Sequence, residues 1–574
     1  MMIGGEAGAG ITRSGFLFAK ACLRGGLHVF GTNDYQSLIR GGHNFYIARA
    51  DSEEIYSQAD TIDLLLALNK ETILLHKDEL VQNGGIVYDE EESTLTEGEL
   101  GRKDLKLYPV PLTATVKELG GTPIMRNTVA LGATTALLTY DLNILNEVMR
   151  DTFKPKVAET NVKAAKKGYD YAREKYASDF DYSLERTTPN GKRKIFLTGS
   201  EAVGLGCIRA GCKFYAGYPM TPATPVHHFL AQLDREYGMI VMQAESEIAA
   251  INMTAGASFA GVRAMTATSG GGFCLMSEGL GMTGMTETPI VVMVAQRHGP
   301  STGLPTYSCQ ADLRFTIHAS QGEFPRIVIA PGDVEECFYK TMEAFNLAEK
   351  FQIPAILLTD KYLAESHGAP EFFDQDRIGI NRGRLMTNDE YADEEEYKRH
   401  KLTEDGVSPR AMPGMKGAIV RTNADEHNES GYTTEDSELT TKMADKRFKK
   451  LDTLVRNLES YETTKLYGSD EAEVTIIGWG STKGPIREAM KLLGKERQNV
   501  NYLQIMYLNP FPTAKVRRIL KSTTKTIVVE NNKTSQLSSL IREHLLTAVD
   551  HKILKYDGRP FNPGELSRRI MEVL

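Results

Sequence analysis

Residues 239–269 read "MIVMQAESEIAAINMTAGASFAGVRAMTATS": a short apolar run, a helical segment and a second short apolar run in succession. Apolar runs of this length without polar alternation are typical of strands that a parallel sheet buries on both faces. The same pattern continues in "KIFLTG", "KFYAGYP", "PIVVMVAQ", "RIVIAP" and "AILLTD". The fold class that these segments predict is α/β, a doubly wound parallel sheet with right-handed crossovers.

The composition of the 574-residue chain is that of an ordinary globular protein, with 41% hydrophobic and 25% charged residues. Its net charge of -8 argues against a nucleic-acid-binding surface. Its apolar runs, such as "TIDLLLAL" and "TPIVVMVA", are far shorter than the roughly 20 residues of a membrane-spanning helix. The opening "MMIGGEAGAG" has no basic region followed by an apolar stretch, so no secretory signal is expected. We therefore expect a cytoplasmic protein without nucleic-acid or membrane partners.

The cysteines of the chain are scattered and form no C-x-x-C pair. They are Cys22, Cys207, Cys212, Cys274, Cys309 and Cys337. The close spacing of Cys207 and Cys212 has no second pair to complete a metal site. We expect buried or incidental thiols in a reducing compartment, no metal site and no iron–sulfur cluster on this chain.

Changes in composition divide the chain into four segments. Residues 1–185 open with glycines and then alternate helices with strands, which are expected at "LHVFGTND", "YIARAD", "TIDLLLALN" and "GGIVYD". A polar connector, "ERTTPNGKRK", follows. Residues 194–365 contain the doubly wound sheet. Residues 366–469 are acidic and polar with little apolar periodicity, which favours a solvated insertion or linker. Residues 470–574 return to strands and helices and form a last α/β domain.

The segment "GYPMTPATP" (217–225) follows one apolar run and precedes a predicted helix. Thr224 suits the N-cap and Pro225 the first helical position, so this is a strand-to-helix turn at the carboxyl end of a parallel strand. Ligands gather at that edge in open α/β sheets. Two prolines restrict the backbone around Thr221, whose hydroxyl can donate to an anion. The alternative is a rigid turn without a ligand.

Two glutamates, Glu245 and Glu247, stand where the strand of residues 239–243 ends and the next helix begins. Carboxylates at that position usually cap the helix, and this interpretation stays open. The helix is rich in alanine and glycine, which let another helix or chain approach closely. A carboxylate at the start of a helix buried in such an interface would have a raised pKa and could exchange a proton or bond a protonated ring.

Arg297 lies just past the run "PIVVMVAQ", again at the carboxyl end of a predicted strand. Its planar guanidinium suits a carboxylate, although a structural salt bridge would explain it equally well. Thr221, Glu247 and Arg297 come from three separate strand ends on one predicted edge. That convergence indicates a site for an anionic small molecule with an acid/base carboxylate.

The N-terminal "GGEAGAGITRSG" (4–15) is glycine-rich but matches no nucleotide-binding fingerprint. Arg13 stands at the third glycine position of G-x-G-x-x-G, and the Gly-Lys-Ser/Thr of a Walker A loop is absent. A turn at Gly5, Gly8 and Gly10 that presents backbone N–H groups to a phosphate stays open, as does a tight packing turn.

Taken together, "YPMTPATP", "ESEIAAINMTAGASFAGVRAMTATSGGGF", "TETPIVVMVAQRHGPSTGLPT" and "VVENNKTSQL" resemble the 2-oxoacid:ferredoxin oxidoreductases. The glycine-rich opening and "QSLIRGGHNFYIARAD" (36–51) resemble the γ domain of that family. The chain is thus similar to an α subunit with an N-terminally fused γ domain, with the 2-oxoglutarate enzymes as the best match. The resemblance implies a transketolase-like domain at 194–365 that binds the pyrimidine of thiamine diphosphate. It also implies a γ-type α/β domain at 1–185 and a transketolase C-terminal-like domain at 470–574.

The resemblance also implies roles for single residues. Glu247 looks like the glutamate that bonds the aminopyrimidine ring nitrogen, with Glu245 as the second candidate. Thr221 and Arg297 correspond to residues that hold the 2-oxoacid carboxylate.

In the motif around Thr221, Tyr218 and Pro219 are candidate cofactor-binding residues. The family usually has Ile where this chain has Met220, and Ser or Thr where it has Ala223. Neither change alters the threonine hydroxyl, but Ala223 removes one polar contact.

The features that are missing fit the same family. No Gly-Asp-Gly motif with a downstream Asn is present, since "YDGRPFN" and "APGDV" do not match in context. In the family that motif, with its Mg²⁺ and diphosphate, and the iron–sulfur cysteines lie on the β subunit. The resemblance therefore implies that this chain forms half of an active site and needs a β subunit as partner.

The reaction that the resemblance implies is oxidative decarboxylation of a 2-oxoacid to acyl-CoA and CO₂, with electrons passed to ferredoxin. Coenzyme A is the co-substrate, and 2-oxoglutarate is the favoured 2-oxoacid. A pyruvate, branched-chain or aromatic 2-oxoacid enzyme is the alternative, and a non-catalytic nucleotide- or coenzyme A-binding protein is a second one. "GVSPRAMPG" (406–414), with Arg410, is a candidate for selecting the distal group of the substrate.

Overall fold

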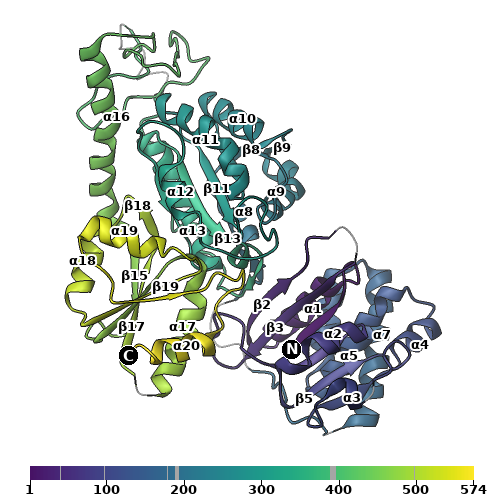
Figure 1. Cartoon of the computed structure of the whole chain (residues 1–574). Coiled ribbons are helices and arrows are strands. Elements are labelled where there is room, and N and C mark those ends of the chain that lie inside the picture. The colour runs from purple at the N-terminus through teal and green to yellow at the C-terminus, as the bar shows by residue number, and fades with distance from the viewer. Residues whose placement is uncertain (39–40, 96, 178, 188–192, 388–395, 497) are drawn as a thin grey trace. The chain divides into compact units, whose positions relative to one another are not determined.

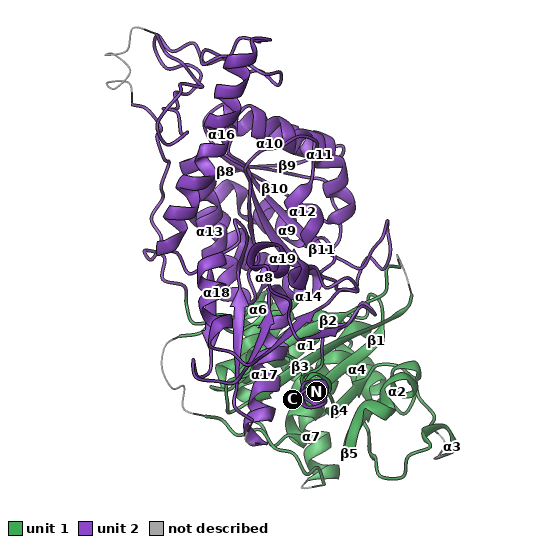
Figure 2. Cartoon of the chain, turned by 60° about the vertical axis from the view of Figure 1, so that its left-hand side comes forward, with its two compact units in different colours: residues 1–197, 366–372, 562–566 green, residues 198–365, 373–561, 567–574 purple. Residues whose placement is uncertain are grey.

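The computed structural model describes residues 1–38, 41–95, 97–177, 179–187, 193–387, 396–496 and 498–574. Contacts divide the chain into two compact units, which Figure 2 colours separately. Unit 1 comprises residues 1–197, 366–372 and 562–566, and unit 2 comprises residues 198–365, 373–561 and 567–574. Our four-segment division remains a prediction. Its first connector includes 188–192 and its acidic segment includes 388–395, both of which lie outside the described residues.

Unit 1 is built on one mixed sheet of order β6-β5-β4-β1-β3-β2-β14-β7. Its strands are β1 (Met2–Glu6), β2 (His28–Asp34), β3 (His43–Asp51), β4 (Ile62–Ala67), β5 (Leu80–Tyr88), β6 (Lys106–Pro109), β7 (Leu197–Thr198) and β14 (His367–Gly368). The run β1-β4-β5-β6 is parallel, whereas β3 pairs antiparallel with both β1 and β2. The strands expected from "LHVFGTND", "YIARAD", "TIDLLLALN" and "GGIVYD" are all present.

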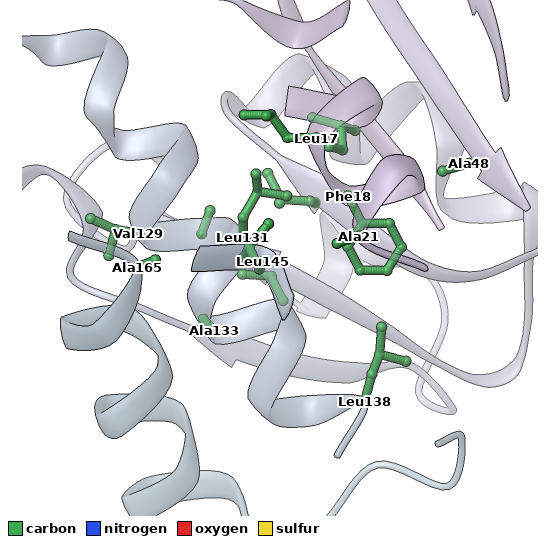
Figure 3. Close-up of a cluster of buried hydrophobic side chains, with 14 of the residues drawn as sticks. Leu17, Phe18, Ala21, Ala48, Val129, Leu131, Ala133, Leu138, Leu145 and Ala165 are labelled. Carbon is green, nitrogen blue, oxygen red and sulfur yellow. The ribbon is translucent and has the colours of Figure 1, made fainter. Parts of the chain in front are cut away.

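The helices of unit 1 pack closely through small residues. They are α1 (Ile11–Arg24), α2 (Lys70–His76), α3 (Glu97–Leu100), α4 (Leu112–Glu118), α5 (Arg126–Leu137), α6 (Leu142–Thr152) and α7 (Pro155–Tyr176). Figure 3 shows part of their shared core, with Phe18 of α1 and Leu131 of α5 in one apolar cluster. A Cβ at Gly132 of α5 would overlap the carbonyl of Ala165 in α7. Glycine therefore permits this close helix contact.

The strand predicted from "KIFLTG" belongs to the sheet of unit 1 and not to the doubly wound sheet. Only β7 forms there, and it lies beside β14 at the end of the eight-stranded sheet. Ile195 N–H donates to the Pro370 carbonyl, and the Phe196 ring stacks on His367 at 5.0 Å. These contacts with residues 366–372 decide the sheet to which the strand belongs, and no local pattern reports them.

Unit 2 contains the doubly wound sheet, in the order β18-β12-β13-β11-β10-β8-β9. Its strands are β8 (Cys212–Gly217), β9 (Ile240–Gln243), β10 (Arg263–Thr268), β11 (Val291–Gln296), β12 (Ile327–Ile329), β13 (Ala355–Asp360) and the antiparallel edge strand β18 (Tyr507–Asn509). Every residue of β10, β11 and β13 is buried, as the unbroken apolar runs predicted. The parallel α/β fold class is confirmed.

The direction of winding reverses between β8 and β10. From β8 the chain moves to β9 at the sheet edge, and then crosses back over β8 to β10. Right-handed crossovers in opposite directions place the helices α9 and α10 on opposite faces. The helices are α8 (Gly199–Arg209), α9 (Thr224–Tyr237), α10 (Glu247–Phe259), α11 (Gly270–Met285), α12 (Leu313–His318), α13 (Val334–Phe351) and α14 (Lys361–Glu365) (Figure 1). A ligand crevice is expected at the carboxyl edge where winding reverses.

The last part of the chain forms a five-stranded sheet, β15-β17-β16-β19-β20. Its strands are β15 (Thr464–Tyr467), β16 (Val474–Gly478), β17 (Val500–Ile505), β19 (Lys525–Glu530) and β20 (His551–Leu554), and its helices are α17 (Lys483–Lys495), α18 (Thr513–Lys521), α19 (Gln536–Leu545) and α20 (Pro563–Met571). Ile477, Trp479 and Leu503 share one apolar core with Val292 and Leu358 of the larger sheet. This continuous core explains why the two sheets form a single compact unit.

The described part of segment 366–469 is more ordered than a solvated linker would be. It carries the 21-residue helix α16 (Ser437–Asn457), which buries Met443, Lys446, Lys450 and Leu454 on one face. Because Lys446 and Lys450 occupy two positions of this buried face, the sequence does not show the apolar periodicity of an amphipathic helix. Both lysines bind Glu287, which follows α11 and is fully buried. Within the described ranges, no helix is long and apolar enough to cross a membrane.

Candidate functional site

The strand ends at the winding reversal bring Thr221 and Arg297 together. Thr221 follows β8 and Arg297 follows β11, with β10 between them in the sheet. Arg297 Nη1 donates to the Thr221 carbonyl at 2.8 Å. The bond fixes the arginine against the turn, and both residues are half-buried. The guanidinium keeps its other N–H groups for a further acceptor.

Glu247 lies at the start of α10 with an unsatisfied carboxylate. Its side chain is 3% exposed, and Oε1 is buried without a hydrogen-bond partner. The capping that the sequence left open is done by Ser246, whose Oγ accepts from Ala249 N–H at 3.3 Å. Glu247 therefore does not serve as the cap. A buried acceptor without a partner costs free energy unless a ligand satisfies it.

A glycine on α11 connects Glu247 with the Thr221 turn. A Cβ at Gly272 would lie 2.5 Å from Glu247 Oε1 and would overlap Thr268 Oγ1. Thr268 Oγ1 also contacts the sulfur of Met220 at 3.8 Å. The ends of β8 and β10 and the starts of α10 and α11 thus meet at one place, beside the Arg297–Thr221 pair.

The other residues expected near this site are less enclosed. Tyr218, Pro219 and Glu245 are exposed, so of the two glutamates only Glu247 is buried. The prediction that Thr224 caps α9 is wrong by one residue. The helix begins at Thr224, its N-cap is Ala223, and no side chain caps it. Pro225 in the first turn already removes one N–H that would need a cap.

Asp312 is a site residue that the sequence did not indicate. Its N–H donates to Gln296 Oε1 at 2.9 Å, and a Cβ at Gly270 would lie 2.9 Å from its carboxyl carbon. The carboxyl group therefore packs against the first turn of α11, near Arg297. Burial raises the pKa of Asp312 to about 6, and Arg297 partly opposes this. Burial also lowers the pKa of Arg297, which Asp312 partly opposes.

Chemically, this edge of the sheet combines the Arg297 guanidinium, the buried carboxylate of Glu247, the half-buried carboxyl group of Asp312 and an uncapped helix. Ser269, at the N-cap of α11, makes no capping bond, and its Oγ is buried without a partner. The N–H groups of a helix start and a guanidinium both favour an anion. Glu247 adds an acceptor for an N–H group. The arrangement suits a ligand that carries both an anionic and an N–H-bearing part.

In unit 1 the predicted glycine turn is shorter than expected. Gly5 lies within β1, so its inclusion in the turn was wrong. It packs where a Cβ would lie 3.0 Å from Leu68 Cβ. Gly8 (φ 88°) and Gly10 (φ 77°) adopt left-handed backbone conformations just before α1. None of these three glycines lines the cavity of about 470 Å³ in this unit, which lies beside Met1.

Arg410, the candidate for substrate selectivity, is buried and engaged elsewhere. Its Nη2 donates to Glu349 Oε1 at 2.8 Å. Glu349 is on α13 and also binds Arg263, which is the first residue of β10. Arg297 instead comes just after the last residue of the parallel strand β11, at the opposite edge of the sheet. Arg410 therefore lies toward the amino edge of the sheet, away from the Thr221 turn.

Comparison with known proteins identifies the family. The family model "Pyruvate flavodoxin/ferredoxin oxidoreductase, thiamine diP-bdg" matches residues 205–446, "Pyruvate ferredoxin/flavodoxin oxidoreductase" matches residues 1–171, and "Pyruvate:ferredoxin oxidoreductase core domain II" matches residues 472–566. The 2-oxoacid:ferredoxin oxidoreductase subunit alpha of a Sulfolobus species is 34% identical, over 100% of this chain and 96% of its own. The chain belongs to the 2-oxoacid:ferredoxin oxidoreductase family.

Two further relatives of this oxidoreductase alpha subunit extend the comparison. The 2-oxoglutarate synthase subunit KorA of Methanothermobacter thermautotrophicus is 32% identical, over 66% of this chain and 99% of its own. The solved structure of 2-oxoglutarate:ferredoxin oxidoreductase from Magnetococcus marinus, with 2-oxoglutarate, coenzyme A and succinyl-CoA bound, is 37% identical. It has a TM-score of 0.91 and covers 100% of this chain and 98% of that one.

These matches confirm the family resemblance and the fold class drawn from the sequence. The chain is an enzyme subunit of the class that oxidises 2-oxoacids with ferredoxin as acceptor. The alternative of a non-catalytic nucleotide-binding protein is thereby excluded. The assignment of the individual site residues is supported by their contacts in the structure alone.

Proposed function

We propose that this alpha subunit supplies half of a 2-oxoacid oxidoreductase site: it binds the aminopyrimidine of thiamine diphosphate through Glu247 and the 2-oxoacid carboxylate through Thr221 and Arg297. The observation that carries the proposal is the buried, unpartnered Glu247 Oε1 beside the Arg297–Thr221 pair. The proposed reaction is coenzyme A-dependent oxidative decarboxylation to acyl-CoA and CO₂, with electrons passed to ferredoxin.

The residues present fit thiamine diphosphate. A ring nitrogen with its proton would satisfy Glu247 Oε1, and Gly272 leaves room beside that oxygen. When bound, this cofactor supplies the carbanion chemistry for decarboxylating a 2-oxoacid. Glu247 holds a proton between its Oε1 and the ring, and burial of the carboxylate keeps water away from that proton. Tyr218 and Pro219 are proposed cofactor contacts, and Glu245, being exposed, is the weaker candidate for the ring bond.

The substrate carboxylate is proposed to bind between the Arg297 guanidinium and the Thr221 hydroxyl. Their backbone bond pre-positions the pair, which lowers the ordering cost of binding. 2-Oxoglutarate is the proposed substrate, because the Magnetococcus relative carries it and the KorA relatives are 2-oxoglutarate synthases. Pyruvate and other 2-oxoacids are the alternatives that the experiment below separates.

Coenzyme A is the proposed co-substrate, since the Magnetococcus relative binds it. In unit 1, Gly8 and Gly10 precede α1 in left-handed conformations, and no side chain caps that helix. The free N–H groups of the first turn are a candidate contact for a phosphate of coenzyme A. Gly5 lies in β1, which leads into this turn.

A β subunit is the proposed partner that completes the site with Mg²⁺, diphosphate contacts and the iron–sulfur cluster. Beside Glu247, the surface exposes large apolar side chains of β9, α10 and α11. They are Ile240, Met242, Ile248, Met253 and Leu275. Apolar side chains gathered over neighbouring elements mark an interaction surface. We call these five residues the β9–α11 face. The protein is proposed to act in the cytoplasm with ferredoxin.

The experiment is kinetic and uses the chain co-expressed with its β subunit. Arg297→Ala should raise KM for 2-oxoglutarate about 10- to 100-fold, because a charge-assisted bond is lost. Arg235→Ala, on the exposed side of α9, is the matched control and should leave KM unchanged. An unchanged KM in Arg297→Ala would remove its carboxylate role.

The same preparation decides the substrate and the partner. We expect kcat/KM to be highest for 2-oxoglutarate in a panel with pyruvate and branched-chain and aromatic 2-oxoacids. A higher value for pyruvate would overturn the substrate proposal alone. Turnover by the alpha subunit without the β subunit would overturn the half-site proposal.

A further inference from the structure

A buried carboxylate in unit 2 is shared by three arginines. Glu349 on α13 is 2.8 Å from Arg263 Nε, 2.6 Å from Arg382 Nε and 2.8 Å from Arg410 Nη2. Arg263, Arg410 and Glu349 are all buried. The three arginines come from β10 and from two places in the segment that follows β14. Burial lowers the pKa of Arg410 to about 10, and a fourth arginine, Arg399, lies close enough to add to this effect.

Positive charge exceeds negative charge in this cluster. Within the described ranges, Glu349 is the one carboxylate in ion-pair distance of Arg263, Arg382 and Arg410. Arg399 donates to neutral acceptors, Gln352 Oε1 at 2.8 Å and the Glu287 carbonyl at 2.6 Å. Three guanidiniums therefore share the single negative charge of Glu349, and Arg399 adds a fourth positive charge near Arg410.

Arginine cannot relieve such a surplus by losing its proton. The lysines that bind Glu287 behave differently: burial lowers the pKa of Lys450 to about 7. A lysine can become neutral, but a guanidinium stays charged in proteins. Burying a charge without a partner carries a large desolvation penalty. A further anion would balance the positive charge that the described residues carry here.

Two guanidinium nitrogens in the cluster are buried without a hydrogen-bond acceptor, Arg382 Nε and Arg410 Nη1, although Arg382 Nε lies within ion-pair distance of Glu349. Arg410 is 6% exposed, and its Nη1 is buried with no hydrogen-bond partner. Arg263, by contrast, uses Nε, Nη1 and Nη2 on Glu349, the Ala210 carbonyl, Asn346 and the Asn381 carbonyl. The side chain of Arg382 is 33% exposed, so the cluster reaches the surface on that side.

We propose that Arg410 and Arg382, with Arg399 nearby, form a binding site for a small oxyanion such as phosphate or sulfate. The oxyanion accepts from Arg410 Nη1 and balances the surplus charge around Glu349. The bound oxyanion would link the segment that carries Arg382, Arg399 and Arg410 to α13 and β10. It would thereby stabilise the packing of this segment, which follows β14, against the sheet. The site is separate from the proposed 2-oxoacid site and does not depend on it.

The test measures inorganic phosphate binding to the full chain in complex with its β subunit. Titration calorimetry at constant ionic strength should show saturable phosphate binding, and phosphate should raise Tm more than chloride does. Glycerol 3-phosphate tests whether the oxyanion can arrive on a phosphomonoester. Binding of either form supports the site. Equal Tm shifts with phosphate, sulfate and chloride, without saturable binding, would overturn it.

Variants keep the test decisive if the buried arginine proves essential for folding. Arg410→Gln and the partly exposed Arg382→Gln should each weaken phosphate binding at least about tenfold. Arg384→Gln is the matched control, since Arg384 pairs with Asp405 instead of Glu349. Glu349→Gln should bind phosphate more tightly than the native chain, because the competing carboxylate charge is removed. Phosphate binding that Arg382→Gln leaves unchanged would overturn the proposal.

Discussion

Glu245 and Glu247 are two residues apart and have opposite environments: the first is exposed, and the second is buried with one oxygen unsatisfied. We expect Glu247→Gln to lower kcat about 10²- to 10⁴-fold, because a positioned acid/base group is lost while the side-chain volume is kept. Glu245→Gln should stay within about twofold of the native rate. The measurement is 2-oxoacid turnover by the complex with the β subunit, together with the Tm of each variant.

Both variants replace a glutamate by glutamine and so remove the same charge. A difference between them therefore reports the catalytic role of the position and not the loss of charge. A strong loss in Glu245→Gln with a normal Glu247→Gln would assign the ring bond to Glu245 instead. Because the side-chain amide in Glu247→Gln could still make one hydrogen bond, thiamine diphosphate binding should fall less than kcat.

Asp312 should make substrate binding depend on pH. With a pKa of about 6, its carboxyl group is mostly ionised above pH 6 and mostly protonated below. The ionised form competes with the substrate carboxylate for Arg297, so KM for the 2-oxoacid should rise as pH increases through about 6. Asp312→Asn should lower KM at pH 7.5 and flatten that profile. The check is KM from pH 5.5 to 8, and an unchanged profile in the variant would contradict this role.

At the scale of elements, the β9–α11 face should bind the β subunit. Met253→Lys on α10 places a charge on this apolar face, and burying that charge in an interface costs enough to weaken association at least about tenfold. Leu546→Lys is the control, because Leu546 is 90% exposed at the end of α19, outside the face. Size-exclusion chromatography of the co-expressed subunits gives the readout. Full association of Met253→Lys, with normal turnover, would place the β subunit elsewhere.

How far sequence predicts an element depends on where its stabilising contacts lie. The strands β10, β11 and β13 were predicted because burial on both faces leaves an unbroken apolar run. Helix α16 was missed because Lys446 and Lys450 occupy its buried stripe and are paired with Glu287, far away in sequence. β7 was assigned to the wrong sheet because residues 366–372 provide its neighbours.

The residues of the candidate site also divide into those that the sequence predicted and one, Asp312, that it did not. Thr221, Glu247 and Arg297 each lie within four residues of the end of a parallel strand, so sheet geometry alone predicted that they share one edge. Asp312 ends a loop of 15 residues after Arg297, and its return to the same edge depends on the bond to Gln296. No local pattern carries that information.

At the scale of the whole molecule, each unit buries a histidine that must stay neutral. In unit 1, His367 stacks on Phe196 and lies 3.2 Å from the Tyr46 hydroxyl, and burial lowers its pKa to about 4. In unit 2, burial lowers the pKa of His400 to about 3, although the hydrogen bond to Glu287 opposes this.

These histidines predict that the free energy of unfolding falls as pH decreases from about 6.5 to 4. The unfolded chain takes up a proton at each histidine near pH 6.5, whereas the folded chain does not until pH 4 or below, so acid favours unfolding. For His367 the shift corresponds to at most about 3 kcal/mol. His367→Phe keeps an aromatic ring beside Phe196 but cannot titrate, so its stability should fall less steeply with acid than that of the native chain. Calorimetric unfolding between pH 8 and 4.5 measures both slopes, and identical slopes would show that His367 already takes up its proton in the folded state.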